Sequence, residues 1–100
     1  MARTFIVERP AGSAWVAGRG AREQPLWDEH AVFMDVLFEG GAVVLGGPLA
    51  DGGAVLVMEA ENEDEVRRLL AGDPWMVEAA VQGVGHIREW EIFLDAREKE

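Results

Sequence analysis

Two side chains suited to proton transfer stand out in this sequence, the histidine at position 30 and the aspartate at position 73. An imidazole gains or loses a proton near physiological pH, because its ordinary pKa is about 6.5. A carboxylate within hydrogen-bond distance would fix its tautomer and favour the imidazolium form. His30 and Asp73 could then act together as a general acid and base on a bound small molecule.

Both residues also have a purely structural explanation. His30 falls on an apolar helix face, with Leu26, Phe33, Met34 and Leu37 at helical spacing, and a lone histidine there is usually a core residue. Asp73 precedes Pro74, which is favourable chemistry for starting a helix, and such a cap contributes about 1 kcal/mol. A capping carboxylate keeps a second oxygen free, so the two roles of Asp73 are compatible. The residues alone leave these alternatives open.

Other catalytic chemistries find little support. There is no cysteine, so disulfides, thiolate nucleophiles and cysteine zinc sites are excluded. Ser13 is the sole serine and lies outside any G-x-S-x-G motif. His86 and the acidic residues show no metal-ligand spacing, and His86 is better explained as a strand residue at a rim or interface. We therefore expect neither a metal nor an organic cofactor.

Length, composition and charge narrow the class of protein. The 100 residues fit one domain, and a hydrophobic share of 49% is that of a folded globular protein. A net charge of −10 would repel a phosphate backbone, so nucleic acid is not an expected partner. There is no signal peptide and no apolar run near the ~20 residues of a membrane span, so we expect a soluble, cytoplasmic protein without a membrane partner.

The positive charge gathers near the beginning of the chain. Residues 1–22 contain four arginines and one acid, Glu8, although the whole chain is acidic. Chance placement on a solvated surface would explain this distribution. Alternatively, Arg19 and Arg22, on a loop, attract a small anion toward the otherwise acidic body.

The pattern along the chain predicts a β-α-β-β-α-β order. The expected elements are a strand at 4–8, a long loop at 10–24, a helix at 25–39 with Pro25 in its first turn, a strand at 42–45 closed by a bend at 46–48, a strand at 54–60, a helix capped by Asn62 and ended by Gly72, a short helix at 73–80, a strand at 84–94 and a charged tail at 95–100. This order indicates an α+β, ferredoxin-like antiparallel sheet with its helices on one face.

The strands carry apolar residues on both faces. In the strand at 54–60, Val55 and Val57 point one way, whereas Leu56 and Met58 point the other. Helices can cover only one face, and an antiparallel sheet with a wet face should alternate apolar and polar residues. We therefore expect a second copy of the chain to cover the other face, giving a homodimer packed sheet to sheet.

The order of these motifs resembles the YciI-related (YCII) domain family. The resemblance rests on H-x-x-F-x-x-x-L-x-x-x-G at 30–41, G-G-P-L at 46–49, the strand ending in Glu59-Ala60, and D-P-W at 73–75, and it extends to about Trp90. It implies a dimeric α/β barrel built from ferredoxin-like halves, with an active site at His30 and Asp73. One member of the family is a dehydrochlorinase acting on a chlorinated hydroxyhydroquinone. Members often have an arginine shortly before the histidine, where this chain has Trp27, Asp28 and Glu29, and a tyrosine where it has Trp75.

We therefore expect a homodimeric small-molecule enzyme of this kind, performing an elimination, isomerisation or hydrolytic reaction without a cofactor. His30 would be the general acid/base and Asp73 its orienting partner. The ligand, anionic or aromatic, would lie among Trp75, Gly47, Pro48, Arg19 and Arg22, with the loop 10–24 as wall or lid. The alternatives are a non-catalytic dimeric module that binds a small ligand in the same cleft, and a purely structural dimer.

Overall fold

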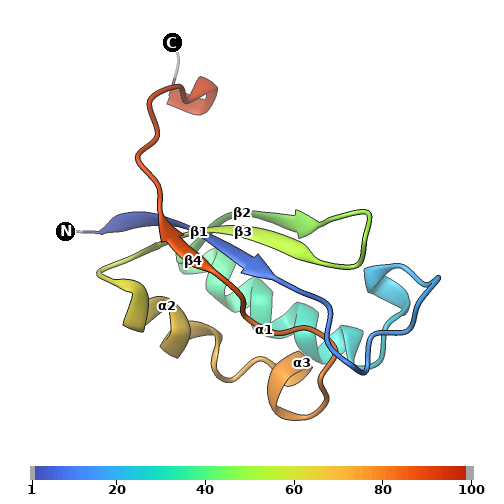
Figure 1. Ribbon diagram of the computed structural model, residues 1–100. Helices are drawn as coiled ribbons and strands as arrows, with labels where there is room; N and C mark the ends of the chain where they lie inside the picture. Colours follow the sequence, from blue (N-terminus) through green and yellow to red (C-terminus); the bar gives the residue numbers. More distant parts are fainter. Residues whose placement is uncertain (1, 99–100) are drawn as a thin grey trace.

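The computed structural model describes residues 2–98, which form a four-stranded antiparallel sheet with helices packed against one face (Figure 1). The elements are β1 (Arg3–Arg9), α1 (Trp27–Glu39), β2 (Val43–Pro48), β3 (Ala54–Ala60), α2 (Glu63–Leu70), α3 (Pro74–Val77) and β4 (Ile87–Glu89), with 3-10 helices at Ala21–Glu23 and Ala96–Glu98. The strand order is β2-β3-β1-β4. This confirms the predicted α+β fold and its β-α-β-β-α-β order, with α3 as an additional short helix.

The hydrophobic core lies between the sheet and the helices. β1 contributes Phe5 and Val7, β3 contributes Leu56 and Met58, and α2 contributes Val66 and Leu70. Successive side chains of a strand point to opposite faces, so the inward face of β1 continues from Phe5 and Val7 to Arg9. The sheet thereby places an arginine in the interior at the end of β1.

The helix starts follow the predicted caps at two of three places. The side chain of Asn62 accepts a hydrogen bond from the backbone N–H of Glu65, and that of Asp73 accepts one from Trp75. The placement of Pro25 in the first turn of α1 is wrong. Leu26 precedes the helix in a left-handed conformation with φ of 61°, which a helix cannot continue through, so α1 begins at Trp27.

Two strand boundaries also differ from the prediction. β2 does not stop before Gly46 but continues through Gly46-Gly47-Pro48, paired with β3. A Cβ atom on Gly46 would lie 2.7 Å from Cδ2 of Leu56, so any larger residue there would require the Leu56 side chain to move. The last strand is shorter than 84–94, because regular pairing with β1 covers only Ile87–Glu89 and the chain then leaves the sheet (Figure 1).

The predicted charged tail at 95–100 is described as far as residue 98. In this segment, Arg97 of the short Ala96–Glu98 helix forms an ion pair at 2.8 Å with Asp95, which directly precedes that helix. Residues 99–100 lie outside the described residues. Within residues 2–98, every helix is too short or too polar to cross a membrane.

Replacing Asn62 by alanine should destabilise the protein by about 1 kcal/mol, because the N–H of Glu65 loses its acceptor. Asn62→Ser, which keeps an acceptor oxygen, should lose much less. Thermal unfolding would show a melting temperature about 4–8 °C lower for the alanine variant. Equal melting temperatures for the alanine and serine variants would show that the cap contributes nothing.

Candidate functional site

The carboxylate of Asp73 lies at the centre of the site. It follows α2, caps α3 and is fully buried. Its Oδ1 accepts hydrogen bonds from Nδ1 of His30 at 2.8 Å and from the backbone N–H of Trp75 at 3.0 Å, and its Oδ2 lies 2.9 Å from Nη1 of Arg9. Three elements, β1, α1 and α3, therefore meet at one carboxylate, which acts both as a helix cap and as a partner of His30.

The surroundings of Asp73 keep it ionised. Burial alone would raise the pKa of this carboxyl, but the hydrogen bonds from His30 and Trp75 and the nearby positive charge of Arg9 together hold it below its ordinary value. Burial lowers the pKa of the Arg9 guanidinium, and Asp73 opposes that effect. An arginine nevertheless stays charged, so a buried ion pair stands behind the histidine.

The same carboxylate fixes the tautomer of His30. A carboxylate can only accept, so Nδ1 must carry the proton in their 2.8 Å hydrogen bond. The other ring nitrogen, Nε2, has no hydrogen-bond partner among residues 2–98, and His30 is part of a cavity wall. In the neutral imidazole this leaves Nε2 as a free proton acceptor beside a ligand cavity.

Tryptophan rings hold the imidazole in place. Trp75 stacks on His30, with ring centroids 3.7 Å apart and an interplanar angle of 7°, and its Nε1 donates to the carbonyl of Pro25 at 2.7 Å. Trp27 lies across both rings at 5.8 Å, and Trp15 meets Trp75 edge-on at 6.1 Å. Because the stack is anchored at Pro25 and at Asp73, the ring plane of His30 is defined from two sides.

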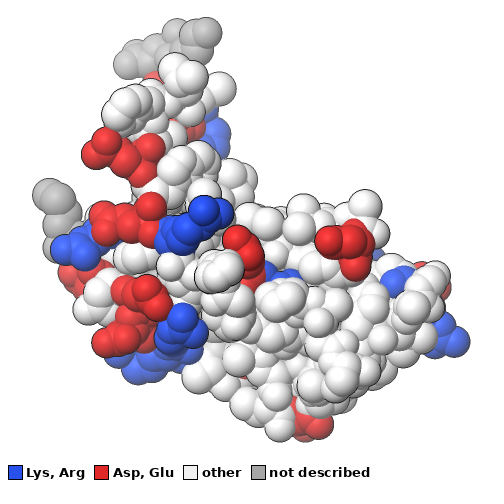
Figure 2. Space-filling view, in the orientation of Figure 1, with Lys and Arg blue, Asp and Glu red and all other residues white. Residues whose placement is uncertain are grey.

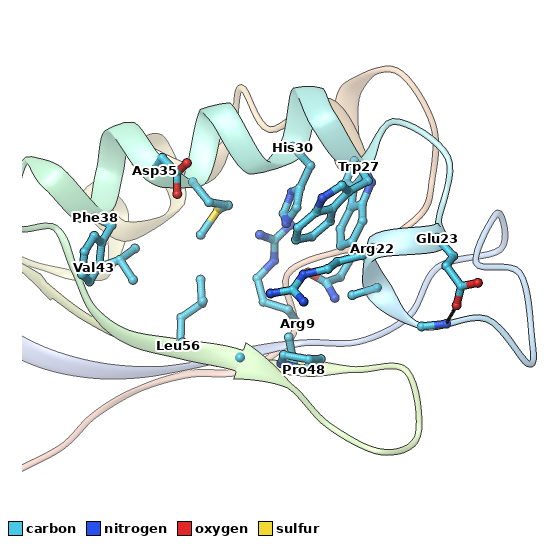
Figure 3. A pocket seen from close by; sticks show the side chains of 18 residues that line it. Arg9, Arg22, Glu23, Trp27, His30, Asp35, Phe38, Val43, Pro48 and Leu56 are labelled. Atoms are coloured by element: carbon cyan, nitrogen blue, oxygen red, sulfur yellow. Dashed lines mark hydrogen bonds between the residues drawn. The ribbon is translucent and has the colours of Figure 1, made fainter.

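The cavity has a volume of about 640 Å³, within the range of small-molecule sites. It lies between α1 and the ends of β2 and β3, and its two ends differ (Figure 3). Arg9, Arg22, Trp27 and His30 gather at one end, whereas Phe38 and Val43 lie toward the other, together with the carboxylate of Asp35. The arrangement suits a ligand with a polar head and an apolar body.

Most of the residues expected at the site line this cavity. Trp75, Gly47, Pro48 and Arg22 do so together with His30, and Asp73 lies behind the histidine. Arg19 does not line it. Its side chain is exposed, and its carbonyl accepts a hydrogen bond from Nε2 of Gln24.

The loop 10–24 forms a wall of the cavity through Gly20–Glu23. The buried side chain of Gln24 ties the loop together, because it pairs with the backbone N–H and carbonyl of Val16 at 2.7 and 3.0 Å. Basic side chains lie at the end of the molecule that carries this loop (right in Figures 1 and 2). Basic side chains also lie at the opposite end of this face, among acidic ones (Figure 2).

The residue that the sequence reasoning missed is Arg9. The predicted first strand ends at Glu8, so the prediction assigns no direction to the side chain of Arg9, which the structure places on the inward face of β1. The available signal was the period of two in Phe5, Val7 and Arg9. Its pairing with Asp73, 64 positions later, depends on the tertiary fold.

Neither histidine belongs to a metal site among the described residues, which contain no cluster of three or more potential ligands. His86 is exposed beside β1, with its Nδ1 3.5 Å from Oε1 of Glu8. It is thus at a rim of the sheet and outside the cavity lining.

Comparison with known proteins gives one solved structure and no sequence family. No family model matches the chain, and no curated protein sequence matches it significantly. A similar structure is that of 5-chloro-2-hydroxyhydroquinone dehydrochlorinase (TftG) from Burkholderia phenoliruptrix AC1100 in complex with 2,5-dihydroxybenzoquinone. The TM-score is 0.60 at 24% identity, over 90% of this chain and 95% of the other. At that identity the match establishes a shared fold.

Replacing Asp73 by asparagine should destabilise the protein by about 3–5 kcal/mol at neutral pH, because the buried guanidinium of Arg9 loses its counter-charge. The pKa of Asp73 is lower in the folded protein, so the unfolded chain binds the proton more readily. The free energy that the ionised carboxylate of Asp73 contributes to folding is fully present above the ordinary carboxyl pKa of about 4. This contribution is lost as pH falls through the pKa of Asp73 in the folded protein. Urea unfolding should therefore show that the difference in free energy of unfolding between the wild-type protein and D73N becomes smaller below about pH 4.

Val66→Ala provides a control that destabilises the protein without involving a proton, because Val66 is a fully buried apolar residue of α2. The loss in free energy of unfolding caused by Val66→Ala should be the same at every pH. If the D73N deficit is equally constant, the carboxylate is not coupled to its buried partners as described.

Proposed function

We propose that this protein is a small-molecule enzyme in which His30 is the general acid/base and Asp73 its orienting partner. One observation carries the proposal: Nδ1 of His30 contacts the buried carboxylate at 2.8 Å, while His30 lines the cavity and its Nε2 has no hydrogen-bond partner within residues 2–98. A carboxylate behind an imidazole fixes the reactive tautomer and stabilises the imidazolium that forms when Nε2 takes a proton. A core histidine would need neither the cavity nor the free nitrogen.

An elimination is the reaction that these groups support best. Nε2 of His30 would remove a proton from the substrate, and the electron pair released would expel a leaving group such as chloride. Asp73 would stabilise the imidazolium, which then returns its proton to water. The step needs no oxidant or metal, because the substrate loses only a proton and an anion.

The shared fold and the sequence motifs support a proposal for the substrate class. We place the chain in the YciI-related family, on the resemblance at His30 and at D-P-W 73–75, and the fold of a dehydrochlorinase supports that placement. The cavity, with its tryptophan walls and its arginines, would accept a chlorinated hydroxyhydroquinone or a similar oxygenated ring. Trp75, Gly47, Pro48 and Arg22 would contact it, with Arg19 attracting it from the surface.

We further propose that two copies pair through the helix-free faces of their sheets. Leu45, Val57 and Ile6 lie opposite one another across three strands on that face; Leu45 is 50% exposed, whereas Val57 is already buried. The C-terminal segment rises from the same side (Figure 1), and its Phe93 and Leu94 are 84% and 95% exposed. A partner sheet would cover this apolar surface and give the dimeric α/β barrel.

His30→Asn should lower turnover of 5-chloro-2-hydroxyhydroquinone, followed as chloride release, by at least about 100-fold. The amide of asparagine can still donate to Asp73, so the fold should be kept while the base is removed. Arg67→Gln, on the exposed side of α2, is a matched control and should keep full activity. Turnover that survives His30→Asn would remove the acid/base role.

The binding of 2,5-dihydroxybenzoquinone separates catalysis from binding. A rise in the melting temperature with this compound, together with turnover, is expected for the enzyme. If the wild-type protein binds it but turns over no chlorinated hydroxyhydroquinone, the non-catalytic binding module is the better description.

Sedimentation velocity tests the pairing. The wild-type protein should sediment as a dimer at micromolar concentration, and Ile6→Lys should convert it to a monomer, because a charge would be buried between the sheets. Val32→Lys, on the exposed side of α1, should leave the dimer intact. A monomeric wild-type protein contradicts the proposed assembly.

A further inference from the structure

One buried donor beside the His30–Asp73 pair has no partner. Arg9 is only 1% exposed, its Nε donates to the carbonyl of Gly83 at 2.6 Å, and its Nη1 contacts Asp73 at 2.9 Å. Its Nη2 is buried and makes no hydrogen bond with any residue of 2–98. Buried polar atoms are paired in the large majority of cases, so an orphaned guanidinium nitrogen requires an explanation.

The residue that carries the orphaned nitrogen lines the cavity. Arg9 is one of the lining residues, and its side chain rises from the end of β1 toward the ring of His30 (Figure 3). The guanidinium is planar, and two of its three nitrogens are fixed by Gly83 and Asp73. The direction of Nη2 is therefore set before any ligand arrives, which lowers the cost of binding.

The rest of the cavity indicates what would accept from this donor. The second cation, Arg22, has no ion pair within residues 2–98, while the carboxylate of Glu23 is turned back onto the N–H of Gly20 at 3.1 Å. Farther from Arg9, the walls include the apolar side chains of Met34, Phe38 and Leu56, and the carboxylate of Asp35 lies at the same end as Phe38 (Figure 3). The arginines at one end and the apolar side chains beyond them together favour an anion with an apolar body, whose anionic group would lie at the end opposite Asp35.

We propose that Nη2 of Arg9 binds an anionic oxygen of the ligand, and that the cavity takes small organic anions whose apolar body lies along Met34 and Phe38. This inference rests on the proposed function, because it places the anionic oxygen beside Nε2 of His30. Nη2 has almost no contact with solvent, so a neighbouring side chain must give way first. Arg22 is exposed and lines the same cavity, so its side chain can move without unpacking the core.

Benzoate and benzamide provide a matched pair of probes, because they share shape and differ in charge. In calorimetric titration, the wild-type protein should bind benzoate at least about tenfold more tightly than benzamide, as expected for a hydrogen bond to a charged group. Arg9→Lys keeps a cation near Asp73 but loses the planar guanidinium whose second nitrogen, Nη2, would bind the ligand. The substitution should lower the affinity for benzoate about tenfold and change the affinity for benzamide little. Arg67→Gln removes a distant arginine and should change neither affinity.

A spectroscopic measurement on the wild-type protein keeps the inference testable if Arg9→Lys does not fold. The side-chain ¹⁵N–¹H signals of Arg9 should shift on titration with benzoate and stay in place with benzamide. Benzoate binding no tighter than benzamide binding, absence of both included, overturns the inference, as does an unshifted Arg9 signal.

The outcome is independent of catalysis. If benzoate binding depends on Arg9 while His30→Asn keeps full turnover, the acid/base proposal fails and the anion site remains. If His30→Asn abolishes turnover and benzoate shows no dependence on Arg9, the enzyme remains and the anion site fails.

Discussion

The structure depends on one buried carboxylate that is compensated from three sides. Removing the charge of Asp73 from water is costly, and the cost is offset only because an imidazole, a guanidinium and a backbone N–H all point at its two oxygens. That requirement fixes the end of β1, the first turns of α1 and the start of α3 relative to one another. The position of His30 is thus a consequence of how the fold accommodates Asp73.

The same constraint explains the division of the molecule into a packed part and a hollow part. Phe5, Met58 and Leu70 fill the space between sheet and helices, and Asp73 closes the neighbouring region with polar contacts. Beyond the stacked rings of His30 and Trp75, the wall is made of loop and strand-end residues that do not fill the space. A rigid polar cluster therefore borders an open cavity, which is the arrangement that acid/base chemistry needs.

Much of the fold could be predicted from local patterns. The apolar run in Ala54–Ala60 and the caps at Asn62 and Asp73 are short-range signals, and the structure confirms a strand and two helix starts at these places. The predicted start of α1 is wrong because Leu26 adopts a left-handed conformation just before the helix. This conformation occurs next to a contact that is distant in sequence, the hydrogen bond from Trp75 to the carbonyl of Pro25. The prediction of a long last strand at 84–94 is wrong because the apolar residues at 90–94 have the pattern of a strand. Local pattern does not show that β1 pairs with only three residues of this segment.

Some residues of the candidate site could be predicted from the sequence, whereas others depend on the tertiary fold. His30 and Asp73 could be named because a motif resemblance pointed to them, although periodicity alone favoured a core histidine. Arg9 could not be paired with Asp73 before the sheet was known, since β1 and α3 meet only in the folded chain. Arg19 and Arg22 were treated alike, yet only Arg22 lines the cavity, because the hydrogen bonds of Gln24 set the course of the loop between them.

The most direct test of the central claim is the tautomer of His30, read from the ring nitrogen resonances in a long-range ¹⁵N–¹H spectrum. The spectrum should be recorded as pH is raised until the ring signals stop changing. The account predicts a proton on Nδ1, with Nε2 unprotonated, because Asp73 can only accept. A neutral ring protonated at Nε2 would contradict it, since the nitrogen facing the cavity could not then remove a proton from a ligand.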